Sequence, residues 1–305
     1  MHTIDIPEKN ITTEIPSCWD ELTRDQLLYS IELAIMLEKK QITILDYKIR
    51  MLYYFLDIKR TGVQDYKDNK LTDNEKETKY SNIYLLTDLL DYFFREEKHG
   101  KKYIMVWTYD SINNHFPVLD KYYGPDDALI NISFAEFRTA MSFYAKFNQD
   151  KKEDHLNSLV AVLYRPEIPG YESEKLNDDF DGQRRVKFNI HQVERRAAEI
   201  SKISYTKRYA VYLFFRNCVQ HIMNNDIVVD NNKICFGVLF RSNEAETESP
   251  GLGLTGTLYK LADAGTFGSI RETDEAGLYD VLLKLYQWKL EYDEFKRKNK
   301  KHDTG

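Results

Sequence analysis

The chain has 305 residues, a formal net charge of −6, 42% hydrophobic and 30% charged residues, and three cysteines (Cys18, Cys218 and Cys235). Its length allows two or three cores or one elongated helical body, and its composition excludes a disordered chain. The acidic balance gives no global attraction to nucleic acid, the odd and sparse cysteines argue against a disulfide framework, and no apolar run is long enough to cross a membrane.

The N-terminal residues lack the basic and apolar regions of a secretory signal, and a polar lead precedes the first predicted helix. Thr23 and Gln26 form the T-x-x-Q pattern of a capping box, and leucines and isoleucines recur at helical spacing after it. A second helix is predicted from Leu45 to about Ile58. The polar residues 61–80 are predicted to be a mobile insertion.

Helix is predicted to resume at Ser81 and to continue to about residue 98. Residues 101–110, rich in β-branched and aromatic side chains, are the best strand candidate. Ser133 and Glu136 form another capping box, and a further helix is expected to stop before Pro166, because proline cannot continue a helix.

The second half of the chain begins with a proline- and glycine-containing acidic loop at 166–186. From Ile190 the pattern is helical again, with a break near Ser204. Residues 226–240 fit either a strand pair turning at Asn231 and Asn232 or a strand followed by a buried apolar run. An amphipathic helix that ends in a basic tail closes the chain.

These elements predict a mainly α fold with a minor β component, an elongated multi-helix body and a glycine-hinged C-terminal helix. The expected divisions are a helical region at 1–165 with a strand near 102–108, the acidic loop at 166–186, central helices and a short β segment at 187–240, and a glycine-rich linker and C-terminal helix at 241–305. Tyrosine and phenylalanine are abundant, which indicates an aromatic core or an interface equally well.

Gly251, Gly253 and Gly256 fit the G-x-G-x-x-G pattern of a dinucleotide-binding turn. Such a turn needs a strand leading into the first glycine and a second strand with an acidic residue, and neither is predicted here. Residues 241–256 are therefore predicted to be an exposed loop, followed by a short helix from Leu258 to Ala262. Alanine at Gly251 and Gly253 is expected to leave stability nearly unchanged.

Cys218, His221 and Cys235 are weak candidate metal ligands. Cys218 and His221 lie three residues apart on a predicted helix, but no fourth ligand completes a structural zinc site. A buried cysteine and an interfacial histidine explain the pattern better. Paired carboxylates adjacent in the sequence diverge in space, so no catalytic constellation is found and no cofactor is predicted.

Arginines are concentrated around the acidic loop, at Arg165, Arg184, Arg185, Arg195 and Arg196. They are predicted to pair locally with Asp178, Asp179 and Asp181 and so to fix the loop. The alternative is that the cluster at 184–196, together with Lys298, Lys300 and Lys301 of the tail, binds nucleic acid or an acidic partner. The interleaved acidic residues favour the local pairing.

Three short stretches resemble poorly characterised proteins from the virion-assembly gene blocks of tailed phages and prophages, some of them similar to tail assembly chaperones. They are the segment around Trp19, Glu21, Leu22 and Thr23, the Tyr164-Arg165-Pro166 turn, and the segment with Gly265, Phe267 and Gly268. The resemblance implies a non-enzymatic protein of the host cytoplasm or the virion. Its implied partners are other phage structural or tail proteins or a second copy of itself, with neither membrane nor nucleic acid.

Overall fold

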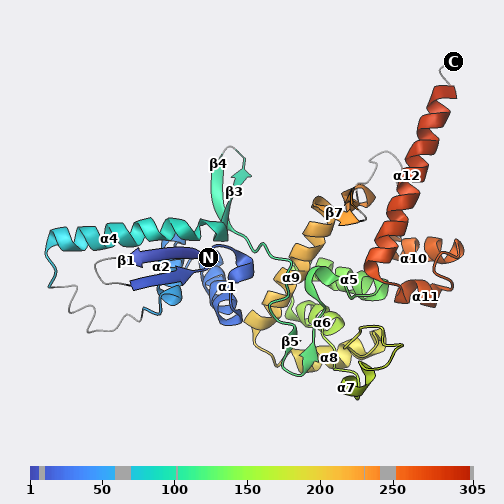
Figure 1. Ribbon diagram of the computed structural model, residues 1–305, viewed down its shortest axis with the longest axis horizontal. Helices are drawn as coiled ribbons and strands as arrows, with labels where there is room; N and C mark the ends of the chain where they lie inside the picture. Colours follow the sequence, from blue (N-terminus) through green and yellow to red (C-terminus); the bar gives the residue numbers. More distant parts are fainter. Residues whose placement is uncertain (7–10, 59–69, 101, 230, 241–251, 303–305) are drawn as a thin grey trace. The chain divides into compact units, whose positions relative to one another are not determined.

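The computed structural model describes residues 1–6, 11–58, 70–100, 102–229, 231–240 and 252–302 (Figure 1). Across these residues the protein is mainly helical and its strands form only short antiparallel pairs, which confirms the predicted fold class. The chain forms two compact units, Met1–Ser111 and Ile112–Gly305. The division predicted at residue 165 falls inside the second unit, because residues 112–165 supply two of its central helices.

Among the described residues of the first unit, two hairpins combine with three α-helices. Strand β1 (His2–Ile6) pairs with β2 (Ile11–Ile15), and the short 3₁₀ helix η2 (Trp19–Glu21) leads into α1 (Arg24–Glu38) and α2 (Ile44–Phe55). Helix α4 (Asp73–Thr87) continues as the 3₁₀ helix η3 (Asp88–Phe93), and β3 (Phe94–His99) pairs with β4 (Lys102–Trp107). The predicted capping box of Thr23 and Gln26 is present at the start of α1.

Aromatic side chains form a cluster in the core of this unit. The ring of Trp19 packs edge-to-face against Phe93, Trp107 and Tyr109, with centroids 4.8–5.4 Å apart. The buried Tyr47 hydroxyl lies 2.6 Å from the Ser30 hydroxyl and accepts a hydrogen bond from Trp107 Nε1 at 2.8 Å. The Tyr47 hydroxyl is thus paired on both sides, as a buried tyrosine requires.

The second unit is built around helix α6. It begins with two short strands, β5 (Val118–Leu119) and β6 (Tyr122–Tyr123), and the 3₁₀ helix η4 (Asp127–Leu129). Helices α5 (Phe134–Asp150), α6 (Glu153–Leu163), α7 (Tyr171–Glu174), η5 (Ile190–Gln192), α8 (Val193–Ile200) and α9 (Tyr205–Asn224) follow. Residues 159–163 of α6 are all buried, which is the pattern of a helix packed on every side.

The rest of the second unit packs on these helices. Strands β7 (Asp226–Val229) and β8 (Asn232–Cys235) form the hairpin that was one of two predicted possibilities, and η6 (Phe236–Leu239) follows. Helices α10 (Gly253–Asp263), α11 (Ile270–Glu275) and α12 (Leu278–His302) complete it. Leu278 N donates to Ile132 O at 2.9 Å and Phe134 N donates to Ala276 O at 2.8 Å, so the start of α12 is fixed beside the start of α5.

Two predicted boundaries are wrong in the first unit. Helix α4 begins at Asp73 rather than at Ser81, because Thr72 and Glu75 form a capping box that the sequence interpretation assigned to a mobile insertion. The same helix was expected to run to about residue 98. The chain changes to strand at Phe94 instead, where pairing with β4 and burial of the Phe94 ring outweigh helical propensity.

The glycine-rich segment also differs from its prediction. Residues 241–251, which include Gly251, lie outside the described residues. The helix expected from Leu258 begins five residues earlier, at Gly253, so α10 includes both Gly253 and Gly256. The predicted apolar face is present, because Leu258 and Leu261 are buried and hold α10 against the unit.

Candidate protein-interaction surface

Two of the predicted interaction arginines are buried on a single carboxylate. Arg165 and Arg185 are each 2% exposed, and Glu136 is 4% exposed. Glu136 Oε2 lies 2.7 Å from Arg165 Nη1 and 3.3 Å from Arg185 Nη1. Taking three ions out of water is costly unless charges and hydrogen bonds match, so this cluster belongs to the protein interior. Neither arginine is available to an outside partner.

The buried arginines also complete the end of α6. The last carbonyls of a helix have no partner within it, and this end carries partial negative charge. Arg196, Arg165 and Arg185 donate to the carbonyls of residues 161, 162 and 163, at 2.7, 3.0 and 2.9 Å respectively. Three arginines, two of them distant from α6 along the chain, therefore cap one helix.

Glu136 is suited to this position by its place in α5. It is the third residue of a capping box with Ser133, so it lies in the first turn of the helix, where a negative charge is favourable. Burial lowers the pKa of Arg185 to about 10, and the Glu136 carboxylate acts in the opposite direction. Arg185 is therefore charged at neutral pH, and the cluster stabilises the fold rather than supplying a reactive group.

The other two candidate arginines lie at the surface. Arg184 Nε pairs with Glu167 Oε1 at 2.7 Å, and its guanidinium lies 4.1 Å from the centroid of the Tyr123 ring. Arg195 is exposed. The expected pairing with the loop aspartates is wrong for Arg165, Arg184 and Arg185, whose ion-pair partners are Glu136 and Glu167.

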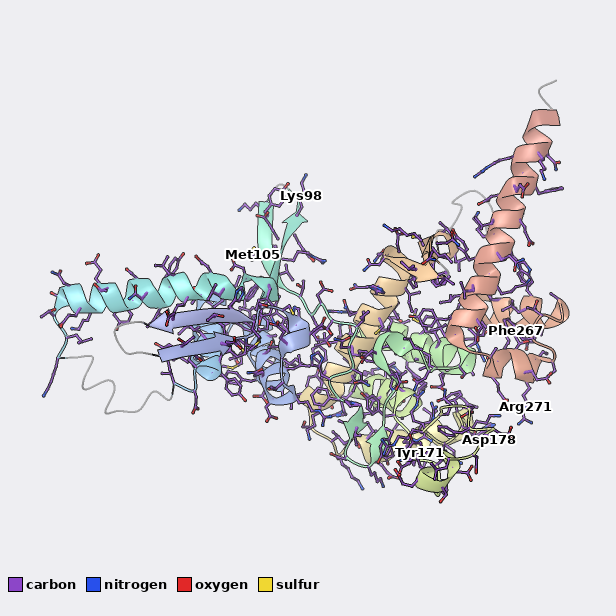
Figure 2. The ribbon with its side chains drawn as sticks, viewed as in Figure 1. Lys98, Met105, Tyr171, Asp178, Phe267 and Arg271 are labelled. Carbon is purple, nitrogen blue, oxygen red and sulfur yellow. The ribbon has the colours of Figure 1, made fainter. Side chains whose placement is uncertain are left out.

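A backbone bridge explains this difference. Glu167 and Arg185 form an isolated antiparallel bridge, at which the Arg185 side chain is buried and the neighbouring Arg184 side chain pairs with Glu167. The three aspartates that were predicted to be the partners are exposed in the loop: Asp178, Asp179 and Asp181. Asp178 is labelled in Figure 2. Arginine contacts fix the loop, but their acidic partners are Glu136 of α5 and Glu167 at the start of the loop, not the three aspartates.

The candidate metal ligands do not form a metal site. Among the described residues, no group of three His, Cys, Asp or Glu side chains is placed to hold a metal ion. Cys218 is buried in α9, where desolvation raises the pKa of its thiol above the usual range. His221 Nδ1 lies 2.8 Å from the side-chain nitrogen of Asn225. Cys218 is thus an inert core residue, in line with the favoured interpretation.

Trp19, the remaining predicted interaction residue, is 3% exposed and lies within the aromatic core of the first unit. The resemblance turn at Tyr164 and Arg165 is also buried, and the Tyr164 hydroxyl donates to Phe116 O at 2.7 Å. These residues are part of the interior of the fold and are not accessible at the surface.

Helix α12 carries an apolar surface along much of its length. Apolar side chains recur along it at spacings of three and four residues, and we call them the α12 stripe: Leu278, Val281, Leu285, Trp288, Tyr292 and Phe295. Leu278 and Val281 are buried against the unit, whereas Tyr292 and Phe295 are 44% and 62% exposed. The C-terminal half of the helix extends away from the rest of the second unit (Figure 1).

Lysines border the exposed half of the α12 stripe. Lys289 and Lys296 lie 5.7 and 4.6 Å from the centroid of the Tyr292 ring, and Lys284 lies 5.6 Å from that of Trp288. Basic residues outnumber acidic ones between residues 284 and 301 of a chain whose net charge is negative. The stripe therefore combines an apolar seam with a positive rim.

This spacing is visible in the sequence but was interpreted only as an amphipathic helix. Periodicity in the sequence identifies an apolar face. It does not show where along α12 this face stops being buried, because burial depends on contacts of Leu278 and Val281 with distant segments. No helix among the described residues is long and apolar enough to cross a membrane. Comparison of the chain with protein-family models, curated proteins and solved structures returned no match.

Proposed function

We propose that the protein is a non-enzymatic, protein-binding component of phage or prophage particle assembly, and that the exposed half of the α12 stripe is its binding surface. The observation that carries the proposal is that one apolar seam is buried at Leu278 and exposed at Phe295 on the same helix. A stripe with spacings of three and four residues fits a partner helix or an apolar groove. The resemblance to virion-assembly proteins supports the biological setting.

The positive rim indicates the chemistry of the partner. An apolar surface bordered by acidic residues would match both the seam and its lysines. The nucleic-acid alternative loses its main support, because Arg185 and Arg196 are buried and bonded to α6 carbonyls. What remains of that hypothesis is the basic end of α12. Measuring nucleic-acid binding at increasing salt concentration would test it.

Site-specific photo-crosslinking in particle-producing cells tests the proposal. A photoreactive phenylalanine analogue at Phe295 is expected to crosslink to a virion or tail protein. The same analogue at Leu290 is the matched control, because Leu290 is 52% exposed on the same helix but lies off the stripe. Equal products from the two positions, or crosslinks to lipid or nucleic acid in place of protein, would contradict the proposal.

Mass spectrometry of purified particles then separates the two forms of this role. An assembly chaperone binds during assembly and is absent from finished particles, whereas a structural subunit remains in them.

Flotation with anionic phosphatidylglycerol vesicles is the accompanying control, since a basic amphipathic helix with aromatic residues is also suited to a membrane surface. Flotation that Phe295→Glu abolishes, without a protein crosslink, would assign the stripe to lipid instead.

A further inference from the structure

The β3–β4 hairpin projects from the rest of the first unit (Figure 1). At its base Phe94 is buried and its partner Trp107 is half-buried. Toward its tip the side chains of residues 102–105 on β4 are all exposed. A two-stranded sheet has two open edges, and unpaired strand edges are ready to accept another strand.

One hydrogen bond determines which backbone groups of β4 face away from β3. Thr108 N donates to Phe93 O at 3.0 Å, so residues 93 and 108 are a hydrogen-bonded pair of this ladder. Such pairs alternate along antiparallel strands. Residues 102, 104 and 106 therefore bond to β3. The N–H and C=O groups of Tyr103, Met105 and Trp107 point away from β3, toward the open edge.

The two edges of the hairpin differ in charge. Between its ends, β3 carries only charged side chains: Arg95, Glu96, Glu97 and Lys98. Between its ends, β4 carries only apolar or aromatic ones: Tyr103, Ile104, Met105 and Val106. Charges on an edge strand discourage pairing with another chain. The β3 edge is thus protected, and no strand of the described part of the chain pairs with the β4 edge.

Symmetry favours a second copy of the same strand at this edge. When two identical strands pair antiparallel, the two-fold axis passes through one residue, which then faces its own copy. On β3 this places like charges opposite each other wherever the axis lies between Arg95 and Lys98, and such pairs are destabilising. On β4 it places apolar side chains opposite each other. Lys102, the charge at the end of β4, would face Val106 or Thr108 of the other copy.

We propose that β4 pairs antiparallel with β4 of a second copy of the chain, giving a four-stranded sheet in the order β3-β4-β4-β3. Both outer edges of this sheet are charged β3 strands, so pairing stops at the dimer. The proposal concerns a different surface from the α12 stripe and does not rest on the assembly role.

Sedimentation velocity of the full chain over a concentration series tests this pairing. The wild-type protein is expected to shift from monomer to dimer as its concentration rises. Met105→Lys, which adds a charge at the centre of the open edge, is expected to weaken association by roughly tenfold or more. Glu96→Lys is the matched control, because Glu96 lies directly opposite Met105 on β3. It adds a lysine at the same level of the hairpin and leaves the β4 edge unchanged.

Hydrogen exchange gives a second readout that does not depend on the variants. On association the amides of Tyr103, Met105 and Trp107 are expected to gain protection, whereas those of Ile104 and Val106 are already bonded within the hairpin. A wild-type chain that stays monomeric throughout would overturn the proposal. So would a dimer that Met105→Lys leaves intact, or protection that fails to alternate along β4.

Discussion

Glu136 is the acidic residue on which two buried guanidinium groups depend. With its carboxylate removed, Arg165 and Arg185 remain buried and lose their charge partner. We expect Glu136→Gln to lower the free energy of unfolding by about 3–5 kcal/mol. The matched change Glu167→Gln breaks the partly exposed pair with Arg184, and it should cost about 1 kcal/mol or less. Urea denaturation measures both, and equal losses would contradict a buried role for Glu136.

Glu199 illustrates a surface carboxylate with a strongly lowered pKa. Hydrogen bonds from Lys121 Nζ at 2.7 Å and Tyr122 Oη at 2.6 Å lower the pKa of Glu199 from 4.5 to about 2. Because the folded pKa is below the unfolded one, these contacts stabilise the fold above pH 4.5, and that contribution is lost as the pH falls toward 2.

Carboxyl NMR of Glu199 is therefore expected to give a titration midpoint near pH 2. Lys121→Met should raise this midpoint by removing the ammonium donor, and Tyr122→Phe should raise it less. Lys202→Met removes a nearby exposed lysine and leaves both donors in place, so its midpoint should match the wild type. A wild-type midpoint near the ordinary glutamate value would show that the two hydrogen bonds are not maintained in solution.

The arginine cluster shows where prediction from the sequence ends at the residue scale. The sequence indicated that arginines fix the acidic loop, and the arginine contacts agree with that. It named the wrong acids, because Asp178 is close to Arg184 along the chain whereas Glu136 approaches Arg165 only after α5 and α6 have packed. The capping box marks Glu136 as a residue of the first helical turn, but nothing local indicates that it pairs with Arg165 and Arg185.

At the element scale, short-range signals were the most reliable. The capping boxes at Thr23 and Ser133 begin α1 and α5 as predicted, because their hydrogen bonds link residues only three apart. The β1–β2 hairpin was missed, since strands of this kind depend on pairing that the polar N-terminal sequence does not reveal. Strand β3 was missed for the same reason, because its residues resemble the end of a helix.

Helix α10 yields a prediction with opposite signs at two glycines. Gly253 has a φ of +55° at the first position of the helix, where a side chain is strained. Gly253→Ala is therefore expected to destabilise α10 by about 1 kcal/mol, contrary to the near-neutral effect that its sequence context suggested. Gly256 lies inside the helix, and an added Cβ would meet only Leu252 Cβ, at 3.2 Å.

Gly256→Ala should accordingly stabilise α10 by about 0.5–1 kcal/mol, because Leu252 is exposed and can shift while alanine favours the helix. Amide hydrogen exchange within α10 measures both variants against the wild type. Effects of the same sign at the two positions would show that the helix does not begin where the structure places it.

At the scale of the whole molecule, the chain consists of two units that each have a core. The aromatic core around Trp19 and Phe93 belongs to Met1–Ser111, and the fully buried segment of α6 belongs to Ile112–Gly305. The sequence suggested enough length for two cores but placed a boundary at residue 165, because the strand and turns after residue 101 gave no signal of a new unit. The position of the boundary depends on which other helices pack against α5 and α6.

Separate cores predict separate unfolding transitions for the full chain. Leu27 is buried in the first unit and Leu159 in the second, so Leu→Ala at either position should cost about 2–5 kcal/mol in its own unit only. Tryptophan fluorescence should follow mainly the first unit, which holds Trp19 and Trp107, whereas far-UV circular dichroism should follow both. We expect Leu27→Ala to shift the fluorescence transition and Leu159→Ala to leave it in place. Leu290→Ala, at an exposed position of α12, is the control and should move neither transition. A single transition that both core variants shift equally would mean that the two units unfold as one.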